Sequence, residues 1–444
     1  MRTFGTAGVR GVFNETQSPK QVFKIAETIV FTFGKGAYGV GWDGRKTSAV
    51  LAQAVISAAM GVGSHPIVFG LVPTPVLAYG TRLEKCHAGF AVTASHNPVE
   101  FSGMKVFDGS GMEMSEEDEA RVERALVIDS HKASKNFGVR RENDYVVDIY
   151  KEELLSRFPR ATKSLVSVVD CGNGPGALVT PSVLMGLGHR VIPLNAHVSW
   201  RFPARPPEPT AETLKDTAKL VVGLKADLGF AHDGDADRLV MINSVGQVVP
   251  DSVVSILAIR ALDVKSRVVV LSENTSSAVA EEVERSGGRI VRSRIGKTFA
   301  KIVSENAVFA TEPSKIVDPS WGLWEDGMYA SVLISDFLSK NREMMKLLTT
   351  GTGWYYKQLN LRIAIDKEKL RQTAEELLSR FRVTEQRSLD GMKFVFKDGS
   401  WIMFRASGTE PITRIYCEAK DPARLQELID EGMKCVDIAR SGPR

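Results

Sequence analysis

Three aspartates alternate within the segment AHDGDADRLV (residues 231–240), directly after the apolar, strand-like segment ADLGFA. Asp233, Asp235 and Asp237 would repel one another unless a cation gathered them, and carboxylate oxygens are the ligands that Mg²⁺ prefers. A solvated acidic turn is the alternative, although three aspartates behind an apolar strand are costly in a turn without a cation. An EF-hand is excluded, because its sixth position is glycine where this chain has Arg238. The pattern predicts a magnesium site beside which Arg238 neutralises charge and holds a phosphoryl oxygen.

A second segment with chemical potential is VTASHNPVEFSGMK (residues 92–105), where Ser95 stands beside His96 and Lys105 follows ten residues later. Neighbours in sequence often point apart, so the Ser-His pair alone does not establish a nucleophile and its base. The same residues also suit a turn in which serine and asparagine bond the local backbone and proline ends a strand. Taken alone, the segment leaves both interpretations open.

The segment RASGTEPITRIY (residues 405–416) has the composition of an anion-binding loop. Ser407, Gly408 and Thr409 offer hydroxyl and backbone N–H groups, and Arg405 and Arg414 flank them. A Ser-Gly-Thr turn between strands with incidental arginines is the alternative interpretation.

The segment RIGKT (residues 294–298) ends like a nucleotide-binding P-loop. A P-loop requires a glycine five positions before Gly296, and this chain has Val291 there, which excludes that motif. Arg294 and Lys297 are candidates for substrate contact, with a solvated loop as the alternative.

Three shorter segments carry weaker signals. FGTAGVRG (residues 4–11) places Arg10 in flexible backbone, and GWDGRKTS (residues 41–48) is a second glycine-rich basic turn after a strand. VPTP (residues 72–75) is interpreted as a rigid turn and nothing more.

The composition is that of a folded globular protein large enough for three or four domains. The chain has 444 residues, of which 43% are hydrophobic and 25% charged. Its 57 basic and 53 acidic residues give a net charge of +4, which is too balanced for a dedicated nucleic-acid binder. Four scattered cysteines without a CxxC pair predict reduced core thiols. No signal peptide or membrane span is apparent, so we expect a cytoplasmic protein that binds neither membranes nor nucleic acid.

The elements that must position these residues alternate between strands and helices up to about residue 350. SRVVVLSEN, SSAVAEEVERSGG, RIVRS and GKTFAKIVSEN show this alternation, which is typical of parallel α/β layers. The order then changes to an α+β pattern. We expect four domains, which comprise residues 1–145, 146–245, 246–350 and 351–444.

Taken in order, FGTAGVRG, TASHNP, DGDADR, the Glu-Pro-Ser segment at residues 312–314 and RASGTEP resemble the motifs of the α-D-phosphohexomutase family. This family includes phosphoglucomutases, phosphomannomutases and phosphoglucosamine mutases, and the likeness extends over essentially the whole chain. The resemblance implies three α/β domains and a C-terminal α+β domain around a central cleft.

The resemblance also implies a role for each motif. Ser95 would be carried as a phosphoserine, and one of its phosphoryl oxygens would bind Mg²⁺ together with the three aspartates. Lys105 and Arg10 would lie near the reacting group, while His96 would orient the loop. The remaining motifs would hold the substrate, with sugar hydroxyls at Glu312 and Ser314 and the non-reacting phosphate at Arg405 to Thr409 and Arg414.

Three segments depart from the family pattern. Ser102 stands where asparagine is usual, and Ala406 stands where proline is usual. The largest departure is TEPSKI (residues 311–316), in which Lys315 and Ile316 replace a Gly-His pair. Lys315 either replaces the histidine as a donor to substrate or faces solvent while Ile316 packs beneath the loop.

We therefore expect a phosphohexomutase that exchanges phosphate between the 1- and 6-positions of a hexose through a 1,6-bisphosphate, which also acts as activator. Glucosamine phosphate is the leading substrate, with glucose and mannose phosphates close behind. The alternatives are a hexose bisphosphate synthase and a non-catalytic sugar-phosphate-binding regulator. We expect a monomer or homodimer whose ligand is a small phosphosugar.

Overall fold

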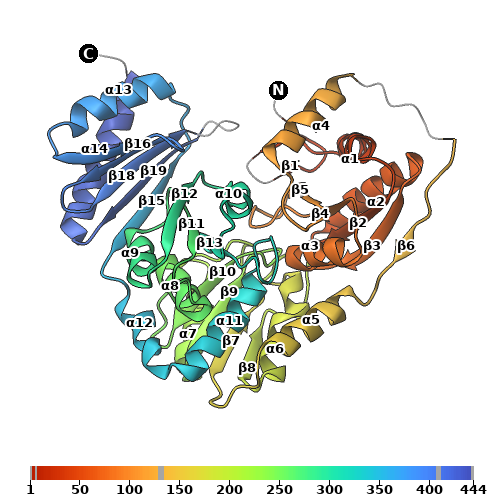
Figure 1. Ribbon diagram of the computed structural model, residues 1–444, viewed down its shortest axis with the longest axis horizontal. Coiled ribbons are helices and arrows are strands. Elements are labelled where there is room, and N and C mark those ends of the chain that lie inside the picture. The colour runs from red at the N-terminus through yellow and green to blue at the C-terminus, as the bar shows by residue number, and fades with distance from the viewer. Residues whose placement is uncertain (1–2, 6–7, 129–134, 407–411, 442–444) are drawn as a thin grey trace. The chain divides into compact units, whose positions relative to one another are not determined.

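The structure, a computed structural model, describes residues 3–5, 8–128, 135–406 and 412–441 (Figure 1). The chain forms two compact units, and each is discontinuous in sequence. Unit 1 comprises Met1–Leu262 and Ser314–Thr349, and unit 2 comprises Asp263–Pro313 and Thr350–Arg444.

The first sheet of unit 1 is mixed, with strand order β1-β5-β4-β2-β3-β6. Strands β2, β3, β4 and β6 run parallel, whereas β5 is antiparallel to both β4 and β1. The central strand β4 is buried along its whole length, as expected where both faces of a sheet are covered. The strands are β1 (Val9–Val12), β2 (Ala37–Trp42), β3 (His65–Leu71), β4 (Ala88–Val92), β5 (Phe101–Asp108) and β6 (Arg141–Glu142).

Four helices accompany this sheet, namely α1 (Pro19–Phe33), α2 (Lys46–Gly61), α3 (Thr74–Leu83) and α4 (Glu116–Ile128). Helix α1 begins with a capping box, in which Ser18 and Gln21 satisfy each other's backbone N–H groups and Pro19 fixes the first turn. Its apolar side packs with α2 and the sheet in one core cluster.

The second sheet of unit 1 has strand order β10-β9-β7-β8. Strands β7, β8 and β9 are parallel, and β10 runs antiparallel to β9 at the edge. The strands are β7 (Val166–Asp170), β8 (Arg190–Leu194), β9 (Leu228–His232) and β10 (Leu239–Asn243). The remaining elements of this unit are α5 (Val146–Arg157), η1 (Pro175–Leu178), α6 (Thr180–Gly186), α7 (Lys215–Gly223), α8 (Asp251–Leu262), β14 (Lys315–Val317), α11 (Gly327–Lys340), η2 (Arg342–Met344) and α12 (Met345–Thr350).

A buried carboxylate organises the aromatic core of unit 1. One oxygen of Asp326 caps α11 by accepting the N–H groups of Met328 and Tyr329 at 3.1 and 2.9 Å. The other oxygen accepts hydrogen bonds from Trp321 Nε1 at 2.9 Å, from Trp324 Nε1 at 3.3 Å and from the Tyr150 hydroxyl. We call these six residues the Asp326 knot, in which one carboxylate accepts all five of these hydrogen bonds.

Unit 2 contains a parallel arrangement followed by an antiparallel sheet. Strand β11 (Val268–Ser272) pairs in parallel with β12 (Arg289–Ser293) and β13 (Phe309–Glu312), and α9 (Ser277–Arg285) and α10 (Thr298–Glu305) connect them. The antiparallel sheet has the order β15-β19-β18-β17-β16. Its elements are β15 (Tyr355–Leu361), α13 (Lys367–Leu378), β16 (Val383–Arg387), β17 (Met392–Phe396), β18 (Trp401–Ala406), β19 (Thr413–Ala419) and α14 (Pro422–Ser441).

Helices α13 and α14 lie together beside this sheet and share one core cluster with it (Figure 1). Strands thus alternate with helices up to residue 350 and an α+β portion follows, which confirms the predicted fold class. Among the described helices, none combines the length and the apolar character that crossing a membrane requires.

Candidate active site

Ser95 lies just beyond the carboxyl end of the buried strand β4, where side chains of a parallel sheet usually carry function. Its φ of +50° falls in the left-handed region, which costs a non-glycine residue free energy and is typical of functional sites. The Ser95 N–H donates to Thr93 Oγ1 at 2.8 Å. The loop is therefore held in a strained conformation by its own neighbours.

Arg45 provides the main support beneath this loop. Its Nη2 donates to the carbonyl oxygens of Ser95 and Asn97 at 2.8 and 2.6 Å, and its Nη1 donates to the carbonyl of Pro98 at 2.6 Å. The buried carboxylate of Asp43 fixes the guanidinium, with Arg45 Nε at 3.2 Å from Oδ2. One buried arginine thus replaces the backbone partners that this irregular loop lacks.

The three aspartates follow β9 directly, as their sequence pattern predicts. All three are buried. Among the described residues they form the one group of at least three histidine, cysteine, aspartate or glutamate side chains that could hold a metal ion. One carboxylate oxygen from each lies within 4.8 Å of the others. A Cβ on Gly234 would lie 2.5 Å from the Ser95 carbonyl oxygen, so only glycine allows this loop to approach the serine loop so closely.

The aspartates carry more acceptor capacity than the protein satisfies. Asp235 Oδ1 and Asp237 Oδ1 are buried and accept no hydrogen bond from any residue that the structure describes. Burial raises the pKa of Asp233 well above its ordinary value, and repulsion from Asp237 and Asp235 adds to this effect. Buried, unsatisfied carboxylate oxygens in a converging group have the chemistry of a site for a hard cation.

Lys105 meets these carboxylates from strand β5. Its Nζ lies 3.4 Å from Asp235 Oδ2 and also contacts Asp237 Oδ2. Burial lowers the pKa of Lys105, but Asp235 and Asp237 outweigh burial and raise it above its ordinary value. At Asp237 burial opposes ionisation, while Lys105, Lys315 and Arg238 together lower the pKa. The ammonium is therefore a permanent positive charge facing the group.

The Ser95 hydroxyl contacts both Asp233 and His96. Ser95 Oγ donates to Asp233 Oδ2 at 2.9 Å and lies 3.2 Å from His96 Nδ1. Burial, followed by the charges of Arg238 and Arg10, lowers the pKa of His96 well below its ordinary value, so the ring is neutral. The serine and aspartate loops, predicted separately from the sequence, thus meet at one hydroxyl.

The VPTP segment does more than turn the chain, contrary to its interpretation from sequence. Thr74 Oγ1 donates to Asp235 Oδ2 at 2.6 Å, and the Thr74 N–H donates to the Asp235 carbonyl at 3.0 Å. This threonine lies in the first turn of α3, so its element orients a carboxylate 161 residues away in sequence.

Arg10 approaches the same group from strand β1, which pairs with β5. Its Nη1 lies 3.4 Å from Asn97 Oδ1, and the charges of Asp235 and Asp237 act on its guanidinium. Gly8 has a φ of +78°, and a Cβ there would lie 2.2 Å from the Met104 carbonyl oxygen. Both features explain why the second glycine of FGTAGVRG is required.

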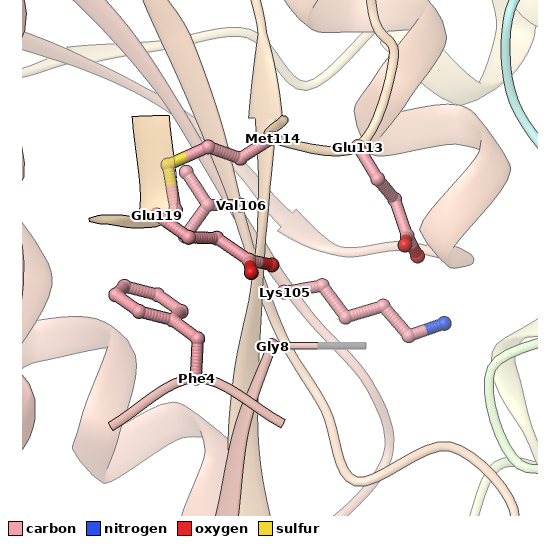
Figure 2. Close-up of a pocket in the computed structure, with 7 residues that line it drawn as sticks. All are labelled: Phe4, Gly8, Lys105, Val106, Glu113, Met114 and Glu119. Atoms are coloured by element: carbon pink, nitrogen blue, oxygen red, sulfur yellow. The ribbon is translucent and has the colours of Figure 1, made fainter. Parts of the chain in front are cut away.

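A small pocket adjoins Lys105, with the lysine ammonium and the Glu113 carboxylate on the same side (Figure 2). It is lined by Phe4, Gly8, Lys105, Val106, Glu113, Met114 and Glu119.

Lys315 lies in unit 1 and forms an ion pair with Glu325, the residue that precedes Asp326. Only 14% of the Lys315 side chain is exposed, so the interpretation in which it faces solvent is wrong, whereas Ile316 is buried as that interpretation supposed. Ser314 has a φ of +63° and its carbonyl accepts the Leu239 N–H at 3.0 Å, next to Arg238. The segment that begins at Ser314 therefore lies against the residues that follow the three aspartates.

In unit 2, Glu312 meets the RIGKT segment. Glu312 Oε1 accepts the Gly296 N–H at 2.7 Å, between Arg294 at the end of β12 and Lys297 before α10. The Ile295 N–H donates to Asp390 Oδ2 at 2.8 Å, and Asp390 Oδ1 pairs with Arg405 Nε at 3.0 Å. Glu312 and Arg405 are thus joined to the same segment of unit 2.

Arg405 and Arg414 lie directly opposite each other on the antiparallel strands β18 and β19. Like charges in this register destabilise a sheet unless an anion or a carboxylate compensates them, and Asp390 forms an ion pair with Arg405. Ser407, Gly408 and Thr409 lie outside the described residues.

Comparison with protein families matches all four domains of one family along this chain. The matches are phosphoglucomutase/phosphomannomutase alpha/beta/alpha domain I over residues 1–131, domain II over residues 143–246, domain III over residues 249–352 and the C-terminal domain over residues 362–434.

Two curated relatives and one solved structure agree with these matches. The chain is 35% identical to a phosphopentomutase of Thermococcus kodakarensis, covering 98% of each chain. It is 34% identical to a probable phosphoglucosamine mutase of Methanopyrus kandleri, covering 98% of this chain and 97% of the relative. A phosphoglucomutase/phosphomannomutase family protein of Burkholderia thailandensis has the same fold, with a TM-score of 0.88 at 23% identity over 100% of this chain and 98% of the other.

Proposed function

Because the chain belongs to the α-D-phosphohexomutase family and is an isomerase-type phosphotransferase, we propose that it interconverts hexose 1-phosphates and 6-phosphates through a phosphoserine at Ser95. The single observation that carries this proposal is the position of Ser95 Oγ, 2.9 Å from Asp233 Oδ2 at the edge of a buried carboxylate group. A serine used for hydrolysis would need a base and an oxyanion hole, not three converging carboxylates.

The residues present fit a Mg²⁺ ion. Asp233, Asp235 and Asp237 supply oxygen ligands within 4.8 Å of one another, and two of their buried oxygens have no partner among the described residues. An oxygen of the Ser95 phosphoryl group would complete the ligand set. When bound, the ion would offset the charge of the phosphoryl group during transfer.

The proposed reaction is balanced over two transfers. In the first, the bond between phosphorus and Ser95 Oγ breaks and a bond to the sugar 6-oxygen forms, which gives the 1,6-bisphosphate. After the intermediate reorients, the phosphoryl group on the 1-oxygen passes to Ser95. The sugar 6-hydroxyl loses a proton in the first transfer and the sugar 1-oxygen takes one up in the second. The enzyme therefore ends phosphorylated as it began. Free 1,6-bisphosphate would rephosphorylate Ser95 and so act as activator.

Four cations of unit 1 are suited to this chemistry. Lys105 faces the aspartates, Arg10 and Arg238 lie beside them, and Lys315 carries a buried charge that acts on Asp237. Phosphoryl transfer depends mainly on positioning and charge stabilisation, which these side chains would supply.

We assign substrate binding to the second group of predicted residues. Glu312 and Ser314 would hold sugar hydroxyls, with Arg294 and Lys297 beside them. Arg405, Arg414 and the loop between them would hold the non-reacting phosphate. Support comes from the opposed arginines of β18 and β19, whose charges a phosphate would compensate. We also propose that residues 1–145, 146–245, 246–350 and 351–444 are the domains that carry these parts.

Glucosamine phosphate remains the leading substrate, supported by the relative named phosphoglucosamine mutase. A pentose 1-phosphate is the second candidate, because another relative is named phosphopentomutase and Lys315 and Ile316 replace the family's usual sugar-loop residues. We further propose a cytoplasmic monomer or homodimer, in keeping with four free, buried cysteines.

The test is a panel of 1-phosphates of glucosamine, glucose, mannose and ribose, assayed with Mg²⁺ in the presence and absence of added glucose 1,6-bisphosphate. A mutase converts at least one hexose phosphate and is stimulated by catalytic bisphosphate. Stoichiometric release of bisphosphate would instead indicate a synthase. Conversion of the pentose phosphate alone would favour the second candidate, and binding without conversion of any sugar would overturn the proposal.

A further inference from the structure

Glu208 joins the two loops that meet at Ser95, although it belongs to neither. It lies in the loop between β8 and α7. Its Oε1 accepts a hydrogen bond from Arg238 Nη1 at 3.1 Å, and its Oε2 lies 3.7 Å from His96 Nε2. The other ring nitrogen, His96 Nδ1, is 3.2 Å from Ser95 Oγ. One carboxylate therefore contacts both His96, next to Ser95, and Arg238, next to Asp237.

The loop that carries Glu208 is firmly fixed. Arg205 is buried, pairs with Asp170 at 3.0 Å and donates through Nη2 to the His232 carbonyl at 2.6 Å, directly before the aspartates. The Glu208 carbonyl accepts the Thr213 hydroxyl at 2.9 Å. Prolines at 206, 207 and 209 restrict the backbone on both sides of the glutamate. The carboxylate is thus presented from a rigid base.

The electrostatic setting explains why such a residue is needed. The negative charges of Asp233, Glu208 and Asp237 all act on the Arg238 guanidinium. Asp233 and Asp237 attract this guanidinium, and the hydrogen bond from Nη1 to Glu208 gives it a partner outside the aspartate group.

We infer that Glu208 is a positioning residue for phosphoryl transfer, which fixes the Arg238 guanidinium beside the aspartates and His96 against Ser95. This inference rests on the proposed function. Glu208 itself makes no contact with Ser95 or with the aspartates among its described interactions, so it acts through these two partners.

The test compares Glu208→Gln, which keeps the size of the side chain but removes its charge, with Glu208→Asp and with the control Glu212→Gln. The Glu212 side chain is 79% exposed in the same loop. We expect Glu208→Gln to lower kcat about tenfold, since it removes the negative charge that strengthens the hydrogen bond from Arg238, and to leave KM for the hexose 1-phosphate within about twofold. Glu208→Asp should recover part of the rate, and the control should match the wild type.

Two further measurements separate positioning from a structural role. The melting temperature of Glu208→Gln should stay within about 1 °C of the wild type, because the side chain is 42% exposed and such ion pairs add little stability. The rate of Ser95 phosphorylation by glucose 1,6-bisphosphate, followed by intact mass, should fall in parallel with kcat.

A double-mutant cycle identifies the partners. Combining Glu208→Gln with Arg238→Gln or with His96→Gln should give an effect smaller than the product of the single effects for at least one pair. Wild-type kinetics in Glu208→Gln, or independent effects with both partners, would overturn the inference. Failure of the wild-type enzyme to convert any sugar phosphate would instead remove the proposed function, so the two failures remain distinct.

Discussion

Two buried carboxylate groups of unit 1 differ in how their oxygens are satisfied. Asp326 accepts five hydrogen bonds, and both of its oxygens are used. Asp235 and Asp237 each leave one buried oxygen without a partner among the described residues, although Lys105 stands beside both. A satisfied carboxylate stabilises the fold, whereas converging unsatisfied carboxylates cost stability and are retained for a ligand. The comparison predicts opposite responses to similar substitutions.

The largest effect should come from Ser95, which joins the unsatisfied group to the chemistry. Ser95→Ala should lower mutase turnover at least about a hundredfold, because no covalent phosphoryl carrier remains. Intact-mass spectrometry after incubation with glucose 1,6-bisphosphate should add one phosphate to the wild-type chain and none to the variant. Equal labelling of both proteins would show that another residue carries the phosphoryl group.

Asp326→Asn should destabilise the protein by about 3 kcal/mol, because an amide group would face two indole N–H groups that can only donate. The free energy of unfolding, measured by chemical denaturation, reports this loss. Turnover per folded molecule should change little at a temperature where the variant is folded. A variant as stable as the wild type would mean that the Asp326 knot contributes no net stability.

Asp235→Asn should stabilise the metal-free protein, whereas Asp326→Asn destabilises it. Removing one of three mutually repelling carboxylates should raise the melting temperature of the chelated protein, while the Mg²⁺ concentration for half-maximal activity rises about tenfold. Asp216→Asn is the control, because the Asp216 side chain is 91% exposed. Full activity after chelation in the wild type would remove the metal from the mechanism.

The comparison also explains what could be predicted from sequence. The three aspartates follow an apolar strand and carry a local pattern, so the sequence predicts them as a group, whereas the role of Ser95 was predicted only through the resemblance of the motifs to a known family. The contribution of Thr74 was missed, because its partner Asp235 lies 161 residues away and nothing in VPTP indicates it. Glu208, Glu325 and Asp390 were missed for the same reason. Arg45 lies in a segment noted only as glycine-rich and basic, and its role depends on carbonyl groups more than 50 residues distant.

The fold class was predictable because strands and helices differ in the spacing of their apolar residues, so their alternation can be recognised in the sequence. The two-unit arrangement was not predictable, because α8 belongs to the same unit as the residues before it and the segment from Ser314 to Thr349 returns to that unit through tertiary contacts. The strain at Ser95 was equally invisible, since serine gives no sign of a left-handed φ as glycine does.

Substitution of Lys315 tests whether this buried cation near the three aspartates contacts the substrate. Lys315→Met should raise KM severalfold for every hexose 1-phosphate if the ammonium contacts phosphate, and should alter the ranking of sugars if it contacts a hydroxyl or amine. Because this change leaves Glu325 buried without its partner, the double variant Lys315→Met/Glu325→Gln controls for misfolding. Unchanged kinetics across glucosamine, glucose and mannose phosphates would restrict the pair to a structural role.

The smallest effect concerns the buried lysine Lys393, whose positive charge is less well compensated by neighbouring carboxylates than that of Lys105. Lys393 in β17 is 3% exposed; its Nζ donates to the Glu273 carbonyl at 2.8 Å and lies 3.6 Å from the centre of the Trp401 ring. Burial lowers the pKa of Lys393 to about 7. The charged groups that act on it are Arg292 and Arg387, which lower the pKa further, and Glu273 and Glu418, which raise it.

The sign of the resulting pH dependence follows from proton counting. Between pH 7 and the ordinary pKa of 10.5, unfolded chains hold a proton on Lys393 that the folded protein has released, so stability should rise with pH in this window. The slope should approach about 1.4 kcal/mol per pH unit, and it should vanish below pH 7, where both states are protonated. Lys105 adds no such slope, because its carboxylate neighbours raise its pKa. Denaturation of wild type and Lys393→Met from pH 6.5 to about pH 9 should therefore give curves that diverge only above pH 7. Parallel curves would show that the buried ammonium keeps its proton, and that its contacts with Trp401 and the Glu273 carbonyl compensate burial as fully as the aspartates do for Lys105.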